Sequence, residues 1–127
     1  MSALRRSVVA AVALCGIAAC GTGNSNEYDA ATIAHGSPHR GHDLIMQYWC
    51  GSCHSIPGIP GATAVVAPPL AGIAERSYIG GVLTNTPDHL REWIMDPPKV
   101  DSNTAMPDMG VSAQDARDIS AYLYTLR

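Results

Sequence analysis

The sequence predicts a small all-α domain in which three main helices are joined by long loops. Three segments have apolar residues at helical spacing, and each begins with a recognisable start signal. The stretches between them, 56–69 and 96–110, are rich in Pro and Gly and contain no alternating run long enough for a strand. At 127 residues the chain has room for one small domain and little more.

The first predicted helix begins at Ser37-Pro38, where an N-cap residue is followed by a proline in the first turn. It is expected to run into Cys50. Its apolar side is formed by Leu44, Ile45, Tyr48 and Trp49.

The second and third predicted helices have equally clear boundaries. Thr86-Pro87-Asp88 opens the second helix and Pro97-Pro98 stops it, because a proline cannot continue a helical hydrogen-bond ladder. Its apolar positions are Leu90, Trp93 and Ile94. Ser112 and Asp115 form a capping box at the start of the third helix. The apolar stripe of that helix comprises Ala116, Ile119, Tyr122, Leu123 and Leu126.

Residues 1–19 have the pattern of an export signal. Arg5 and Arg6 precede an apolar run that is too short to span a bilayer. The run ends in Ile17-Ala18-Ala19-Cys20, which resembles the lipobox of bacterial lipoproteins. The resemblance implies cleavage before Cys20 and a lipid on its thiol, which would anchor the protein on the periplasmic side of a membrane. Gly21 after the cysteine favours the outer membrane. Ordinary signal cleavage, which gives a soluble periplasmic protein, and a retained membrane helix are the alternatives.

Residues 20–37 are small and polar, and they predict a flexible tether before a folded domain at 38–127. Removing the signal leaves 6 basic against 11 acidic side chains, a net charge of −5. The basic surface that nucleic-acid binding requires is therefore absent. Fewer than 100 folded residues without a disulfide framework give a thin core. We therefore expect a large apolar group to fill the middle of the domain.

Cys50-Gly51-Ser52-Cys53-His54 indicates what that group is. A structural zinc site would need a second Cys pair or a downstream His pair, and neither is present. A thiol–disulfide exchanger would place the cysteines at a helix start among strands. Cys-x-x-Cys-His is the attachment signature of haem c, in which two thioethers hold the porphyrin and the imidazole Nε2 binds the iron. This interpretation accounts for all five residues and predicts one haem, bound covalently through Cys50 and Cys53.

The residues that follow His54 resemble class I cytochrome c of the bacterial monohaem type, over about residues 40–127. The resemblance lies in Pro68-Pro69-Leu70-Ala71-Gly72, Arg76, Trp93 and Thr104-Ala105-Met106-Pro107. It implies a small cytochrome c fold, three main helices with long loops around the haem, in which the metal ligands are His54 and Met106. It further implies that the Pro68 carbonyl accepts a hydrogen bond from His54 Nδ1–H.

The same resemblance assigns roles to further side chains. Arg76 would neutralise a haem propionate, Thr104 would add a hydrogen bond near that edge, and Trp93 would lie against the haem. Gly41 would let the first and last helices cross closely. Met109 is interpreted as packing and as the alternative ligand, and Met46 and Met95 as core residues. The remaining histidines are interpreted as surface residues: His35, His39, His42 and His89.

A His/Met ligand pair implies an electron carrier, not an enzyme, because no open position remains on the iron. The expected function is electron relay in a periplasmic respiratory chain, from a reductase or dehydrogenase to an oxidase. Lys99 is the only lysine, so a lysine-ringed docking face cannot form. The alternatives are a haem enzyme or a sensor of peroxide or NO with a labile Met ligand, and a dedicated cytochrome subunit of a larger oxidoreductase.

Overall fold

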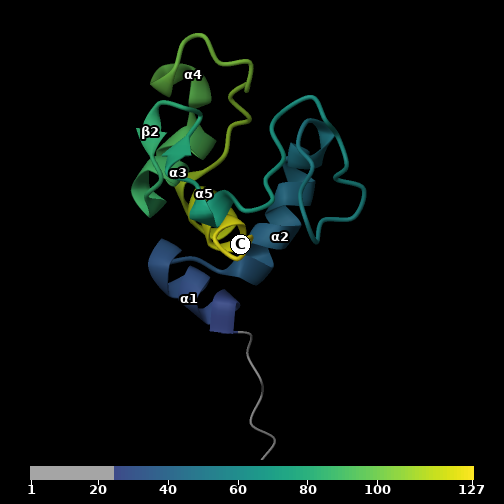
Figure 1. Cartoon of the computed structure of the whole chain (residues 1–127), viewed down its shortest axis with the longest axis vertical. Helices are drawn as coiled ribbons and strands as arrows, with labels where there is room; N and C mark the ends of the chain where they lie inside the picture. Colours follow the sequence, from purple (N-terminus) through teal and green to yellow (C-terminus); the bar gives the residue numbers. More distant parts are fainter. Residues whose placement is uncertain (1–24) are drawn as a thin grey trace, which may run out of the picture.

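The computed structural model describes residues 25–127 and confirms the all-α class (Figure 1). The predicted signal at 1–19 and Cys20 lie outside the described residues. The α-helices are α1 (Ser25–Ala34), α2 (Pro38–Gln47), α3 (Pro87–Met95), α4 (Pro97–Val100) and α5 (Ala113–Leu123). The shorter elements are the 3₁₀ helices η1 (Cys50–Ser52) and η2 (Ile73–Glu75) and the strands β1 (Tyr78–Ile79) and β2 (Leu83–Thr84).

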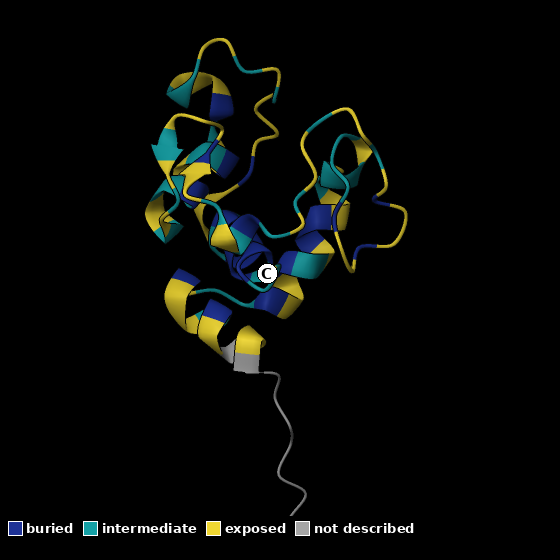
Figure 2. Cartoon of the chain, viewed as in Figure 1, coloured by how far each residue is buried: buried dark blue, intermediate teal, exposed yellow. Residues whose placement is uncertain are grey.

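Helix α5 lies at the centre of the molecule, with α1, α2 and α3 packed against it (Figure 1). Its predicted apolar stripe is confirmed at Ala116, Ile119 and Leu123, which are almost fully buried, whereas Tyr122 and Leu126 are half-buried. Ser112 caps the helix by accepting the Asp115 N–H at 3.1 Å. The core therefore forms around α5, as the dark residues of Figure 2 show.

Helices α2 and α5 cross in direct backbone contact. A Cβ on Gly41 would lie 2.0 Å from the carbonyl oxygen of Asp118 and 2.9 Å from the Cβ of Tyr122. No side chain fits into that space, so the close crossing predicted for Gly41 is confirmed.

The start of α2 is fixed to α5 by a buried carboxylate. Asp118 is only 2% exposed, and its Oδ1 accepts the backbone N–H of Ser37 at 2.7 Å. Its Oδ2 lies 3.4 Å from Nε of Arg40. A buried charge costs little when it is paired and hydrogen-bonded, and a carboxylate is favoured at a helix N-terminus. Asp118 thus holds α2 in register on α5.

Helix α1 corrects the predicted flexible tether over residues 25–34, the part of 20–37 that this helix occupies. Residues 25–34 form a helix that packs on α5, and Ala30 and Ala34 are completely buried. Ala30 and Ala34 are small, so the apolar periodicity of this segment is weak and did not predict a helix. Small side chains one turn apart allow the close approach of the two helices.

Helix α2 ends earlier than predicted. It stops at Gln47, with Tyr48 as its C-cap, and the chain continues into η1. Leu44 and Ile45 are buried as expected, but Trp49 is 73% exposed and is not a core residue. Helix α4 falls in the stretch 96–110, which was predicted as a loop, and the two-residue strands lie between the predicted loop 56–69 and the second predicted helix. Within residues 25–127, no helix has the length and apolarity to cross a membrane.

Candidate functional site

The Cys50–His54 motif is wound into a single tight turn. The backbone N–H of His54 donates to the Cys50 carbonyl at 3.0 Å, and that of Cys53 donates to the same oxygen at 3.3 Å. Trp49 precedes the turn with a left-handed backbone, φ 57°, which directs the chain out of α2. Both cysteines are free thiols and are half-buried. One turn therefore presents two thiols and an imidazole.

The loop after the motif folds back over it. A Cβ on Gly51 would lie 2.8 Å from the Cβ of Ala62, so the small residue lets the loop approach. Tyr122 fastens the loop from α5 by donating to the Pro57 carbonyl at 2.6 Å. Before haem attachment, burial raises the pKa of the Cys50 thiol.

The imidazole of His54 is held by the backbone of residues 67–70. Its Nδ1–H donates to the Pro68 carbonyl at 2.7 Å. Two backbone hydrogen bonds flank this contact, from Ala67 to Cys53 at 2.9 Å and from Leu70 to Ser55 at 2.8 Å. A carbonyl can only accept, so the proton is on Nδ1 and the Nε2 lone pair is available to a metal. Ala67 does not have a positive φ, so its side chain causes no backbone strain here.

Arg76 contacts the same loop from the other side. Its Nη2 donates to the Pro69 carbonyl and to the Ala71 carbonyl, the latter at 3.1 Å. Asn85, which the sequence did not single out, donates to the carbonyls of Ile73 and Arg76, both at 2.8 Å. No sequence pattern predicts such contacts, because the acceptors are backbone carbonyls, which every residue has. Together Arg76 and Asn85 brace the segment that orients His54.

Trp93 lies on α3 and covers the β1–β2 turn. A Cβ on Gly80 would come within 2.5 Å of its Cη2 atom, and Gly80 has φ 56°. Trp93 is half-buried and packs against the core. The glycine is required twice, for the left-handed turn and for the approach of the indole.

Met106 lies in the segment between α4 and α5. Its backbone N–H donates to Thr104 Oγ1 at 3.2 Å, which fixes the local turn, and its side chain is half-buried. Met46 and Met95 were predicted as core residues and Met109 as a packing residue, and the exposure of all three differs from those roles. Met46 (39% exposed), Met95 (36%) and Met109 (42%) lie at the surface.

Two of the histidines predicted at the surface are partly buried. His42 contacts Tyr122 edge to face, with ring centroids 5.6 Å apart, and its Nε2 lies 3.3 Å from the Gly58 carbonyl. His89 Nδ1 donates to the Thr84 carbonyl at 2.9 Å. His35 and His39 are exposed, as predicted.

The predicted ligands come from two arms of the molecule. We call residues 48–72 the motif arm, and residues 77–110 the α3–α4 arm. Figures 1 and 2 show the two arms rising from α5, and the segment between α4 and α5 runs along the side that faces the motif arm. His54 therefore belongs to one arm, and Thr104 and Met106 belong to the other.

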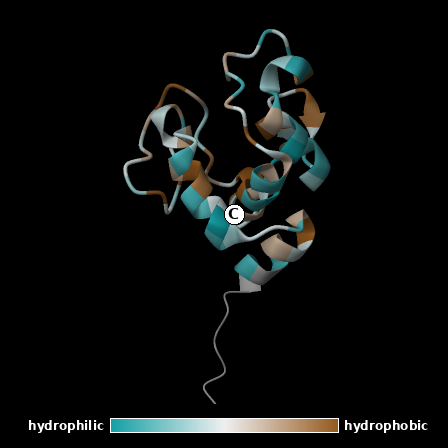
Figure 3. Cartoon of the chain, turned by 180° about the vertical axis from the view of Figure 1, so that it is seen from behind, coloured by the Kyte–Doolittle hydropathy of each residue, from teal (hydrophilic) through white to brown (hydrophobic). Residues whose placement is uncertain are grey.

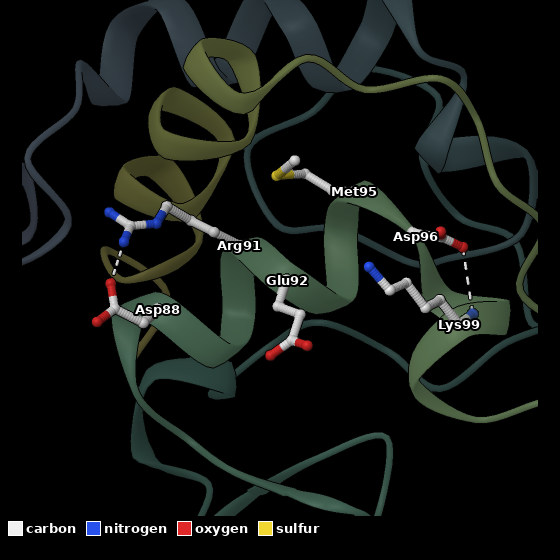
Figure 4. Close-up of a pocket in the computed structure, with 6 residues that line it drawn as sticks. All are labelled: Asp88, Arg91, Glu92, Met95, Asp96 and Lys99. Atoms are coloured by element: carbon white, nitrogen blue, oxygen red, sulfur yellow. Dashed lines mark hydrogen bonds and ion pairs between the residues drawn. The ribbon is translucent and has the colours of Figure 1, made fainter.

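A surface depression of about 260 Å³ lies elsewhere, along α3 and α4 (Figure 4). Its lining is mostly charged: Asp88, Arg91, Glu92, Met95, Asp96 and Lys99. Asp88 pairs with Arg91, and Asp96 caps α4 by accepting the Lys99 N–H at 3.2 Å. The predicted site residues do not line this depression.

The donor set of the motif arm fits haem c. Covalent attachment requires two accessible thiols, and Cys50 and Cys53 are free and partly exposed. Ligation of the iron requires an imidazole with a free Nε2, which the hydrogen bond from Nδ1–H of His54 provides. Among residues 25–127, no group of three or more His, Cys, Asp or Glu side chains could hold a metal ion by itself.

The chain matches the family model for cytochrome c over residues 38–127, and it therefore belongs to the cytochrome c family. It is a haem c electron-transfer protein, with one haem linked covalently through Cys50 and Cys53. Neither the curated proteins nor the solved structures gave a match.

Proposed function

We propose that this cytochrome relays single electrons with its iron held between Nε2 of His54 and the sulfur of Met106. When bound, the haem supplies a one-electron Fe(III)/Fe(II) couple. The observation that carries the proposal is the 2.7 Å hydrogen bond from His54 Nδ1–H to Pro68, because it fixes the ring and leaves Nε2 available. Met106 lies on the facing arm, in a turn held by Thr104.

With His54 and Met106 both bound, the iron would have no open position for peroxide, NO or CO, and the thioether ligand would raise the reduction potential. We further propose that Trp93 and the propionate partners Arg76 and Thr104 line the haem. The present contacts of Arg76 with the Pro69 and Ala71 carbonyls support a place beside the axial imidazole.

Exchanging each of two methionines for leucine tests the axial pair. Met106→Leu is expected to lower the reduction potential by on the order of 0.1 V, within the roughly 0.8 V range that axial ligands span. It should also let the ferrous protein bind CO without denaturant. Met109→Leu is the matched control, because Met109 is three residues away and exposed, and it should change neither property. CO binding by the unaltered protein would instead favour a ligand sensor or a haem enzyme.

We also propose that the protein works at the periplasmic side of a bacterial membrane, anchored by a lipid on Cys20. The lipobox-like Ile17-Ala18-Ala19-Cys20 supports this location. Its donor would be a reductase or dehydrogenase and its acceptor an oxidase of a respiratory chain. Mass spectrometry of protein from mildly solubilised membranes should show one haem and a lipid on a chain that begins at Cys20. A chain without lipid would indicate a soluble periplasmic protein. Copurification with a larger oxidoreductase would make it a subunit of that complex.

A further inference from the structure

The loop that follows the attachment motif closes on itself and lies against the motif. We call residues 55–63 the cover loop, because its Ala62 packs on Gly51. An isolated bridge between Ser55 and Thr63 closes its base. Its apolar side chains are buried: Ile56, Ile59 and Ala62. Opening of the cover loop would therefore expose the turn that carries the two thiols and the imidazole.

Two side chains from different helices hold the tip of the cover loop. Tyr122 of α5 donates its hydroxyl to the Pro57 carbonyl at 2.6 Å. His42 of α2 has its Nε2 atom 3.3 Å from the next carbonyl, that of Gly58. The two rings also contact each other edge to face, with centroids 5.6 Å apart. Glycine is required at the tip, because Gly58 has φ 80° and a Cβ there would lie 2.5 Å from the Tyr122 hydroxyl.

Both ring nitrogens of His42 face an acceptor. Nε2 faces the Gly58 carbonyl, and Nδ1 lies 3.0 Å from Oδ1 of Asp43. The hydrogen bond with His42 lowers the pKa of Asp43, so this side chain is a carboxylate at neutral pH. Carbonyl and carboxylate oxygens only accept, and a neutral imidazole has a single N–H. Only the doubly protonated imidazolium therefore satisfies both contacts.

The neutral ring keeps one of the two contacts and loses the other. Asp43 is the nearer acceptor and is charged, and a charge-assisted hydrogen bond is about twice as strong as a neutral one. The remaining proton therefore stays on Nδ1, and Nε2 points a lone pair at the Gly58 carbonyl. Tyr122 keeps its own hydrogen bond, because burial raises the pKa of its hydroxyl.

The other titratable groups around His42 lie on the helices. A surface depression of about 290 Å³ beside the ring is lined by Asn26, Glu27, Pro38, His39, His42, Tyr122 and Thr125. A carboxylate such as Glu27 favours the charged ring, and His39 lies 4.0 Å from the Asp43 carboxylate. Residues 44–74 contain no Asp, Glu, Lys or Arg, and hydrophobic stretches along the loops of the motif arm are visible in Figure 3. Of the two side chains that hold the tip, only the histidine belongs to a residue type that changes charge between about pH 5 and 8.

We propose that His42 is a pH-dependent positioning residue, whose imidazolium ties the cover loop to α2 and whose neutral form releases the Gly58 carbonyl. The imidazolium donates Nδ1–H to Asp43 and Nε2–H to Gly58. Loss of the Nε2 proton to solvent removes the second donor. The loop over the attachment motif is therefore held more firmly in weak acid than in weak base. This inference goes beyond the electron relay and does not depend on the sixth ligand of the iron.

The ¹⁵N chemical shifts of the His42 ring in the reduced holoprotein measure its protonation directly. At about pH 5 both nitrogens should carry a proton, and at about pH 8 the single proton should be on Nδ1. This measurement needs no substitution, so it holds even where a variant folds poorly. A neutral ring at the acidic end, or a proton on Nε2 at the basic end, would overturn the proposal.

Hydrogen exchange of the segment 55–63, followed by mass spectrometry, measures closure of the cover loop. His42→Phe keeps a ring against Tyr122 and removes both nitrogens. At about pH 5 the native segment should exchange about fivefold more slowly than in this variant, which is equivalent to one hydrogen bond of about 1 kcal/mol. The ratio should fall toward one at about pH 8, and intrinsic exchange cancels because both proteins are compared at the same pH. Equal exchange in acid, or a ratio that does not change with pH, contradicts the proposal.

Two further variants show whether His42 itself is responsible. His39→Phe removes a neighbouring imidazole that is 86% exposed, and it should keep the native pH profile. His42→Gln has a side-chain N–H that does not titrate, so its exchange relative to His42→Phe should be the same at both pH values. Loss of the profile in His39→Phe, or a pH-dependent ratio between the two His42 variants, would assign the effect to another group and overturn the proposal.

Discussion

At the scale of single residues, Gly51 is a position in the attachment motif where a larger side chain does not fit. It stands between the two cysteines, and a methyl group there meets the Ala62 Cβ at 2.8 Å. Contacts this short force either the loop or the motif to move. The spacing Cys-x-x-Cys-His therefore depends on a residue that is not itself a ligand.

Gly51→Ala is expected to destabilise the holoprotein by roughly 1–3 kcal/mol, the usual cost of overpacking. In an Ala62→Gly background the cost should be smaller, because the opposing methyl group is gone. Denaturant unfolding of the four proteins of this double-mutant cycle measures the coupling. Simple additivity of the two substitutions would show that the contact does not constrain the motif.

The helix elements are tied by the hydroxyl of Tyr48, which donates to Asp115 Oδ2 at 2.8 Å. Tyr48 caps α2 just before the motif, and Asp115 lies in the first turn of α5. The Tyr48 hydroxyl, with the Ser112 side chain and the Arg40 guanidinium, lowers the pKa of Asp115. In return, the hydrogen bond to Asp115 raises the pKa of Tyr48. The link thus requires a charged carboxylate and a protonated phenol.

Tyr48→Phe should cost roughly 0.5–1.5 kcal/mol near neutral pH, the net value of one hydrogen bond. Because the folded pKa of Asp115 is lowered, its stabilisation is present above its unfolded pKa and is lost as pH falls through the folded value. The raised pKa of Tyr48 means that the link is also lost as pH rises through the folded value of the phenol. The difference between the two proteins should therefore shrink at both ends of the pH range, as thermal unfolding would show.

Tyr122→Phe is the control for that experiment. Its hydroxyl donates to a neutral acceptor, the Pro57 carbonyl, so the cost of this substitution should not decline in acid. If Tyr48→Phe and Tyr122→Phe behave alike below pH 4, the carboxylate of Asp115 is not the partner that matters.

Helix α1 supplies a second prediction at the element scale. Ala34→Asp places a carboxylate at a position with no exposed surface, and burying a polar group without a partner costs about 1–3 kcal/mol. Because α1 packs mainly on α5, the substitution should weaken the contact between these two helices first. Ile33→Asp, at a position that is 44% exposed, should change stability little. Equal melting temperatures for both variants would show that Ala34 is not packed against the domain, and would favour the predicted flexible tether.

At the scale of the whole molecule, sequence patterns predicted what is local. The sequence correctly predicted the attachment motif and the N-caps Ser37, Thr86 and Ser112, because each of these features depends on only a few consecutive residues. The Gly41 crossing followed from the family resemblance. The contact between His54 and Pro68 was expected on the same basis and is present in the structure.

Features that depend on distant partners were not predictable in this way. Trp49 fits an apolar helical stripe by spacing, yet a left-handed turn carries it to the surface. Met46 and Met95 are apolar by type but lie on exposed faces. Asp118 and Asn85 form hydrogen bonds with backbone groups that are distant in the sequence. Helix α1 buries only two alanines against the rest of the domain, so its sequence gives little sign of a packed helix. Tertiary contacts decided each of these cases.

The central claim is that one iron is held by His54 from the motif arm and by Met106 from the facing arm. The absorption spectrum of the ferric holoprotein at its red end tests this most directly, because a bound thioether gives a weak sulfur-to-iron charge-transfer band there. We expect the band in the native protein and in Met109→Leu, and its loss in Met106→Leu. A native spectrum without the band, or a band that survives in Met106→Leu, would contradict the account.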